Sequence, residues 1–209
     1  MEEHFTILKN RYDAYYKELL SQGKLPMRPT ERGYWGAAIS PIVFDLFKQL
    51  DLKRFSSFVD LGSGDGKVVM LASLFGTKAQ GIESDEELHR TAVALHKELA
   101  VKVPSLSNAE LVRGDYYEHD LSPYQVVFIN PDQPFFRGME KKLLKELNGY
   151  LIVYSHTYHP HELHKLVELT IDGMKIPVYV NKKRQGHTNE HTIKQAKENS
   201  ITTPQTLQN

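Results

Sequence analysis

The residues with the clearest chemical meaning form a glycine-rich, acidic segment at positions 59–67, VDLGSGDGK. Glycine allows a sharp backbone turn and lets a ligand approach without a Cβ in the way. A helix that begins directly after such a turn presents free N–H groups at its start. The segment is therefore typical of a loop that binds a nucleotide-like cofactor. A tight turn without a ligand is the alternative.

The charges around this loop favour one cofactor. A dinucleotide-binding loop has the pattern Gly-x-Gly-x-x-Gly and receives a pyrophosphate, but here the third glycine comes one residue early and Lys67 follows it. Asp60 and Asp65 would repel a pyrophosphate by about 1 to 4 kcal/mol per close charge pair. They suit the ammonium and sulfonium of S-adenosylmethionine, which has no phosphate and whose carboxylate can use the helix N–H groups. The residues expected to hold it are Asp60, Gly62, Ser63, Gly64 and Gly66.

Two further acids lie at the ends of the next two predicted strands, Glu83 as the last residue of its strand and Asp115 shortly after its own. Glu83 lies about 20 residues after the loop, where an acid accepts hydrogen bonds from ribose hydroxyls. Ser84 next to it is also expected to bind the cofactor. Asp115 could accept from the adenine amino group, with Tyr116 covering the ring. Because the carboxyl ends of parallel strands share one edge of a sheet, the loop, Glu83 and Asp115 are expected to line one site. Helix capping by Glu83 and a turn role for Asp115 are the alternatives.

Strands and helices alternate after position 57. Apolar spacing predicts helices over 5–19, 41–50, 68–75, 85–102, 136–147 and 162–169. Positions 24–40 are expected to form a loop. Strands are predicted over 58–61, 79–83, 109–112, 125–129 and 150–154, and 174–180 with 188–195 are expected to form a hairpin around Gly186.

This alternation predicts an α/β protein with a Rossmann-like, doubly wound sheet. We expect a mostly parallel, seven-stranded sheet with a C-terminal antiparallel hairpin and an N-terminal helical extension. The predicted organisation is an N-terminal helix and lid loop over 1–40, a domain over 41–198 that binds S-adenosylmethionine, and a disordered tail over 199–209.

The sequence resembles the class I, Rossmann-like methyltransferases that depend on S-adenosylmethionine. Within that class it is similar to protein-lysine methyltransferases of the disruptor-of-telomeric-silencing type and their small prokaryotic relatives. The segments that carry this resemblance are Ser40-Pro41 before an apolar helix, 60–66 (DLGSGDG), 81–83 (GIE), and 127–130 (VFIN) followed by Phe135 and Phe136. The resemblance implies methyl transfer to an amine nitrogen, and most specifically to a protein lysine.

The acceptor side is expected after the predicted strand 125–129. Asn130 matches the first Asn of the Asn-Asn pair in the lysine-modifying family, whereas Pro131 replaces the second. Asn130 would orient the acceptor amine and is also expected to bind the cofactor, with a plain strand-ending turn as the alternative. Phe135 or Phe136 would wall the pocket or lie in the core. Tyr34 would close over the pocket as part of a lid. An acceptor in a nucleic-acid base, a small-molecule acceptor and a binding module without catalysis remain alternatives.

Other clusters have a simpler interpretation. His156, His159, His161 and His164 match no firm zinc spacing, so a solvated loop and helix start is expected there rather than a metal site. The basic run 181–185 is expected at an exposed hairpin tip, although it could dock an acidic partner.

Composition limits the class of protein. The chain has 209 residues at 24.0 kDa, 26 Lys plus Arg, 26 Asp plus Glu, and no Cys. Zero net charge is a mild argument against nucleic acid. The absence of Cys excludes disulfides and thiolate chemistry. No secretory signal or membrane span is recognised, and a cytoplasmic location is expected. The oligomeric state stays open.

Overall fold

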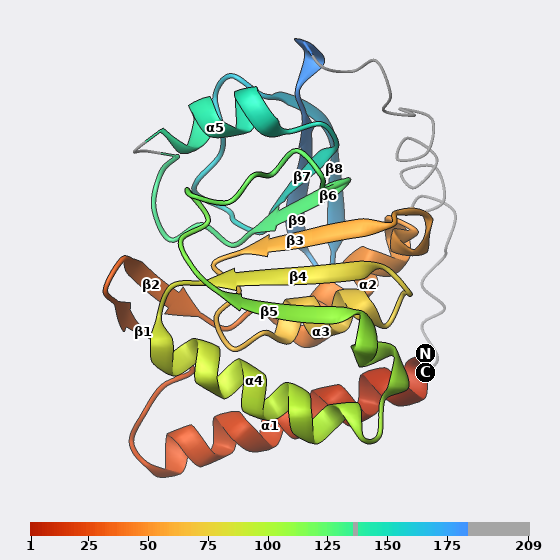
Figure 1. The fold of residues 1–209 in the computed structure, drawn as a ribbon, viewed down its shortest axis with the longest axis vertical. Helices are drawn as coiled ribbons and strands as arrows, with labels where there is room; N and C mark the ends of the chain where they lie inside the picture. The colour runs from red at the N-terminus through yellow and green to blue at the C-terminus, as the bar shows by residue number, and fades with distance from the viewer. Residues whose placement is uncertain (136–137, 184–209) are drawn as a thin grey trace.

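A computed structural model of the chain describes residues 1–135 and 138–183 (Figure 1). The helices are α1 (Glu2–Ser21), α2 (Ser40–Gln49), α3 (Lys67–Ser73), α4 (Glu86–Ala100) and α5 (Met139–Glu146), with short 3₁₀ helices at Leu52–Arg54 and Pro104–Asn108. The strands are β1 (Met27–Thr30), β2 (Gly33–Gly36), β3 (Ser57–Leu61), β4 (Lys78–Glu83), β5 (Ala109–Arg113), β6 (Val126–Ile129), β7 (Tyr150–Val153), β8 (His164–Ile171) and β9 (Met174–Val180).

The central sheet has seven strands in the order β5-β4-β3-β6-β7-β9-β8. Strands β3 to β7 pair in parallel, and β9 runs antiparallel to both β7 and β8. The predicted mostly parallel sheet with a C-terminal antiparallel hairpin is therefore confirmed. The strand order reverses between β3 and β6, and ligands bind open α/β sheets beyond the carboxyl ends of the strands at such a point.

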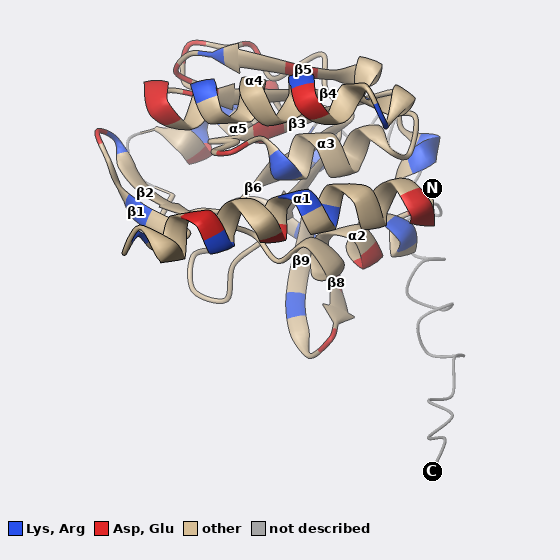
Figure 2. Ribbon diagram, turned by 90° about the horizontal axis from the view of Figure 1, so that it is seen from below, with Lys and Arg blue, Asp and Glu red and all other residues tan. Residues whose placement is uncertain are grey.

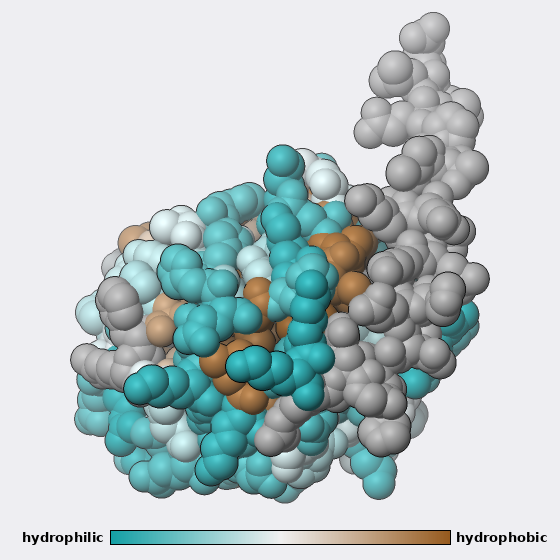
Figure 3. Space-filling view, turned by 90° about the horizontal axis from the view of Figure 1, so that it is seen from above, coloured by the Kyte–Doolittle hydropathy of each residue, from teal (hydrophilic) through white to brown (hydrophobic). Residues whose placement is uncertain are grey.

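The two faces of the sheet have separate apolar cores, because neighbouring strand residues point to opposite sides. Phe58 and Phe128 pack with Phe47 of α2 on one face, which α2 and α3 cover. Val59 and Val127 belong to the other core. Helix α5 covers that second face. In contrast to these apolar cores, the molecular surface seen in Figure 3 is largely hydrophilic, with apolar side chains exposed between polar ones.

The predicted helix over 162–169 is wrong, since residues 164–169 belong to β8 and the two before them are not helical. Its buried residues, Val167, Leu169 and Ile171, recur at every second position, which is the period of a strand. They face apolar residues of β9 across an antiparallel pair. Because of this pairing, the residues after Pro160 do not begin a helix either.

The position of the predicted terminal hairpin is also wrong. Strand β9 pairs with β8, and the two are joined at Asp172 and Gly173, both with positive φ. An Asp-Gly pair in this conformation is the favoured two-residue hairpin connection. The predicted partner strand 188–195, Gly186 and the tail 199–209 lie outside the described residues.

The predicted loop over 24–40 contains a small antiparallel hairpin, β1 with β2. Figure 1 shows it beside the carboxyl ends of β4 and β5. The division into parts at residue 40 stays a prediction. Within the described part of the chain, no helix is long and apolar enough to cross a membrane.

Candidate active site

The glycine-rich loop joins the end of β3 to the start of α3. Gly62, Gly64 and Gly66 all have positive φ, of 75°, 55° and 78°. A side chain at Gly64 would collide with the indole of Trp35, and a Cβ at Gly66 would lie 2.9 Å from that of Ala92. The loop thus requires glycine for its backbone conformation and for close packing on both sides.

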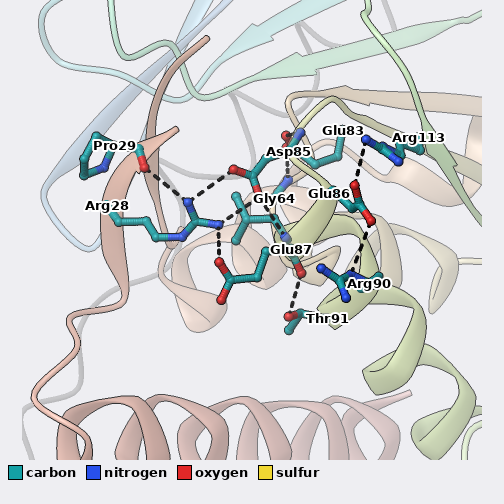
Figure 4. Close-up of polar contacts among 11 residues, drawn as sticks. Arg28, Pro29, Gly64, Glu83, Asp85, Glu86, Glu87, Arg90, Thr91 and Arg113 are labelled. Atoms are coloured by element: carbon teal, nitrogen blue, oxygen red, sulfur yellow. Dashed lines mark hydrogen bonds and ion pairs between the residues drawn. The ribbon is translucent and has the colours of Figure 1, made fainter. Parts of the chain in front are cut away.

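Glu83 lies directly against this loop. Its carboxylate accepts the Gly64 N–H at 2.7 Å and the Asp85 N–H at 2.8 Å (Figure 4). Burial raises the pKa of Glu83, and these N–H groups oppose that rise. The end of β4 therefore places a hydrogen-bonded carboxylate beside the glycine turn.

Asp60 is a buried carboxylate in the middle of the site. Its residue is only 3% exposed. Burial raises its pKa well above the usual value, and the neighbouring charges of Glu83 and Asp65 raise it further. In the portion of the chain described, no hydrogen bond reaches this carboxylate. A buried anion without a partner is costly, so its surroundings are suited to a cationic ligand group.

Two adjoining cavities lie at the carboxyl ends of the strands. The larger, of about 290 Å³, is lined by Tyr34, Gly62, Glu83, Ser84, Asp115, Tyr116 and Asn130 among the predicted residues. The smaller, of about 50 Å³, is lined by Asp60 and Ser63 and shares Tyr34, Gly62 and Asn130 with the larger. Gly64 and Gly66 line neither cavity and shape the loop from within. The structure therefore brings together the side chains that sequence reasoning selected.

The β1–β2 hairpin covers these cavities and is held by residues that follow the strands. Arg28 contacts both carboxylate oxygens of Asp85, at 2.8 and 3.2 Å (Figure 4). Burial tends to raise the pKa of Asp85, but Arg28 and the backbone N–H groups at the start of α4 together outweigh burial, and the pKa ends below its usual value. Arg32 pairs with Asp115. The predicted lid is thus an anchored hairpin, and the sequence analysis missed both arginines because it treated this segment as a loop.

Asn130 follows β6 and lines both cavities. Its Nδ2 donates to the Gly36 carbonyl at 3.3 Å, so the hairpin also orients this amide. Asp132 accepts the backbone N–H of Tyr34. Phe135 packs against the apolar core and lines a small extension of the cavity beside Pro131. Phe136 lies outside the described residues.

Helix α1 contributes contacts that the sequence analysis did not foresee. The Tyr16 hydroxyl donates to Asp65 at 2.6 Å and accepts from the Lys67 ammonium at 2.7 Å. The Tyr12 hydroxyl donates to the Asp65 carbonyl at 2.8 Å. Only the three-and-four spacing of tyrosines on one helical face could have indicated this role.

The histidine-rich segment shows no metal centre. Over residues 1–135 and 138–183, no group of three or more His, Asp or Glu side chains is arranged to hold a metal ion. His164 belongs to β8, and His159 packs 6.4 Å from the ring of Tyr179.

The strand order, the glycine loop after β3 and the acid at the end of β4 define a class I, Rossmann-like methyltransferase. The family described as "Histone methylation protein DOT1" matches residues 29–150, more than half of the chain. The chain belongs to this family. No curated protein matches it.

Solved structures with the same fold act on different acceptors. An RNA methyltransferase from Salinibacter ruber, in complex with S-adenosyl-L-homocysteine, is 22% identical with a TM-score of 0.56, over 70% of this chain and 94% of that one. A Pyrococcus abyssi tRNA (uracil-54, C5)-methyltransferase is 15% identical with a TM-score of 0.53, over 70% of this chain and 45% of its own. Magnesium protoporphyrin IX methyltransferase from Synechocystis PCC 6803, with bound S-adenosylmethionine, is 12% identical with a TM-score of 0.50, over 66% and 76% of the two chains. At these low sequence identities, the similarity to the three structures shows a shared fold and does not identify the acceptor.

Proposed function

We propose that this protein transfers a methyl group from S-adenosylmethionine to an amine nitrogen, with a protein lysine as the acceptor. The observation that carries the proposal is the unpartnered, buried Asp60 carboxylate in a cavity that Glu83 and Asp115 extend. The donor has a cationic amino group, ribose hydroxyls and an adenine amino group. This chain offers one carboxylate for each of them.

The donor would lie across the two cavities in one orientation, with its amino-acid end in the smaller cavity and its adenosine end in the larger. Asp60 would bind its ammonium in the smaller cavity, while Glu83 would accept from the ribose hydroxyls. Asp115 would accept from the adenine amino group, and Tyr116 would pack on the ring. Asp115 is paired with Arg32 on the hairpin, so this ion pair would have to rearrange when adenine binds. The sulfonium of the bound donor supplies a methyl group with a good leaving group.

Catalysis would then consist mainly of positioning the acceptor. The lysine ammonium first loses a proton to solvent. The lone pair of the neutral amine then forms the new C–N bond as the S–C bond breaks, and S-adenosylhomocysteine leaves with that electron pair. Asn130 Oδ1 or the Pro131 carbonyl would accept a hydrogen bond from the amine. Deprotonating a lysine at pH 7 costs about 4 to 5 kcal/mol from its usual pKa, and desolvation lowers that cost. No strong general base is needed.

A lysine acceptor is preferred for two reasons. The family description names histone methylation, and the exposed charge of the molecule favours no polyanion. Figure 2 shows basic and acidic residues interspersed along the ribbon, and the formal net charge is zero. The hairpin arginines Arg28 and Arg32 are also engaged with carboxylates. Because the fold is shared with RNA methyltransferases, a nucleic-acid base is the second candidate acceptor to test.

The test is transfer of radiolabel from S-adenosylmethionine to an extract, followed by digestion with protease or nuclease. We expect label that protease releases and that amino-acid analysis identifies as methyllysine. Label released by nuclease would replace lysine by a base as the acceptor. If the protein bound the donor tightly but transferred no label, it would be a binding module without catalysis.

Glu83→Gln tests the donor site independently of the acceptor. We expect the affinity for S-adenosylhomocysteine to fall about ten- to a hundredfold, because a charge-assisted hydrogen bond is lost. Glu86→Gln is the matched control, since Glu86 is exposed and pairs with Arg113. Equal affinities of the two variants would remove Glu83 from the donor site.

A further inference from the structure

Helix α1 contacts the glycine loop through a chain of polar contacts. Figure 2 shows α1 running alongside α3, the helix that the loop begins. The Lys67 ammonium donates to the Tyr16 hydroxyl, which donates to the Asp65 carboxylate. Tyr16 therefore links a cation and an anion that belong to the same loop and helix start.

Both charges lie in the interior. Asp65 and Lys67 are each 3% exposed. The Lys67 ammonium also lies 4.6 Å from the centre of the Tyr16 ring and 5.6 Å from that of Tyr12. Buried charges are tolerated when they are paired and hydrogen-bonded. The phenol thus satisfies both charges, and its loss would leave them without their shared partner.

The same two residues line the smaller cavity. Asp65 and Lys67 border it together with Asp60. Tyr12 holds the Asp65 carbonyl from the same helix face. The conformation of this wall is consequently fixed from outside the sheet by α1.

We propose that Tyr16 is a positioning residue for the amino-acid end of the methyl donor. It acts through Asp65 and Lys67, which set the wall of the cavity where Asp60 binds the donor's ammonium; this step rests on the proposed function. The adenosine end lies in the larger cavity, which Tyr16 does not contact. Tyr16 therefore affects ligands with an amino-acid end and leaves those without one unaffected.

The experiment compares two ligands by calorimetry. S-adenosylhomocysteine has the amino-acid end, and 5′-methylthioadenosine lacks it. We expect Tyr16→Phe to weaken S-adenosylhomocysteine about tenfold and to change 5′-methylthioadenosine less than about twofold. Tyr15→Phe is the matched control, because Tyr15 also lies near Asp65 on the same helix, but its hydroxyl bonds to Thr91 of α4, whereas that of Tyr16 bonds to Asp65 and Lys67. It should change neither affinity.

The outcomes separate this proposal from the proposed function. Equal weakening of both ligands, or of neither, would overturn the role of Tyr16 while leaving the donor site intact. If the wild-type protein bound neither ligand, the proposed function itself would fail.

Hydrogen exchange on the wild-type protein covers the case in which Tyr16→Phe does not fold. S-adenosylhomocysteine should slow amide exchange in α1 around Tyr16, and 5′-methylthioadenosine should not. Identical exchange in α1 with the two ligands would overturn the proposal.

Discussion

The proposed donor side and the proposed acceptor side of the site differ in how they are built. On the donor side, Asp60, Glu83 and the glycine loop are packed between β3, β4 and α3, and the loop is held by buried hydrogen bonds. On the acceptor side, Asn130 is exposed and Tyr34 is 49% exposed. The contacts there join the hairpin to the segment after β6.

The difference indicates which property each half fixes. Buried, hydrogen-bonded groups are preorganised, so the donor side accepts one kind of ligand with little adjustment. Exposed groups on a hairpin can be rearranged at small energetic cost. We therefore expect substitutions on the donor side to act on affinity and those on the acceptor side to act on turnover.

Gly64→Ala should produce the largest effect and is the strongest challenge to a preformed donor side. A Cβ there requires a strained positive φ and collides with Trp35. We expect affinity for S-adenosylhomocysteine to fall more than about a hundredfold, measured by calorimetry. Gly76→Ala is the control, with φ +82° and no atom near its Cβ. Comparable losses in both variants would mean that backbone strain alone is responsible.

Asn130→Ala tests the same difference between the two sides from the acceptor side. Loss of the group that orients the acceptor should lower kcat about ten- to a hundredfold, with the donor Kd changed less than about twofold. Asn148→Ala, which removes a hydrogen bond to the Ser122 carbonyl, is the control. A large rise in donor Kd for the Asn130 variant would erase the division between the two sides.

Asp60→Asn separates binding from stability. Because the folded-state pKa of Asp60 lies above its unfolded value, the folded protein holds the proton more tightly, and its stability falls as pH rises from about 4 through the raised pKa. The neutral Asn removes this loss. We expect a smaller decline in the free energy of unfolding between pH 4 and pH 7, measured with urea, and donor affinity about tenfold weaker.

The control for that variant is Asp45→Asn on the exposed side of α2. It should change neither quantity. Wild-type donor affinity in the Asp60 variant would show that this carboxylate does not bind the ammonium.

Arg32→Ala should have the smallest effect. Its ion pair with Asp115 is exposed on the Arg32 side, and exposed pairs contribute little. We expect donor affinity to change less than about threefold by calorimetry. A change above tenfold would mean that the hairpin belongs to the preformed half.

The same division explains what the sequence could predict. Strands β3, β4 and β6 and the residues that follow them were predicted because buried parallel strands and a glycine turn have local patterns. Strand β8 was missed because an alternating, half-buried segment also contains apolar pairs three residues apart. Its pairing with β9 decides the matter, and that contact is not local.

Contacts between distant segments also account for the missed site residues. Arg28 reaches Asp85, and Tyr16 reaches Asp65, across more than forty positions in each case. Neither residue type has a local signature for such a role. Only the fold brings these side chains to the loop.

The hairpin has an inner and an outer face, and this has an evolutionary consequence. Trp35 faces the glycine loop, whereas Met27 and Pro29 point to solvent and line neither cavity. Substitutions at Met27 and Pro29 therefore leave both cavity walls unchanged. These two positions can vary by drift, while the glycine loop and the sheet stay under purifying selection.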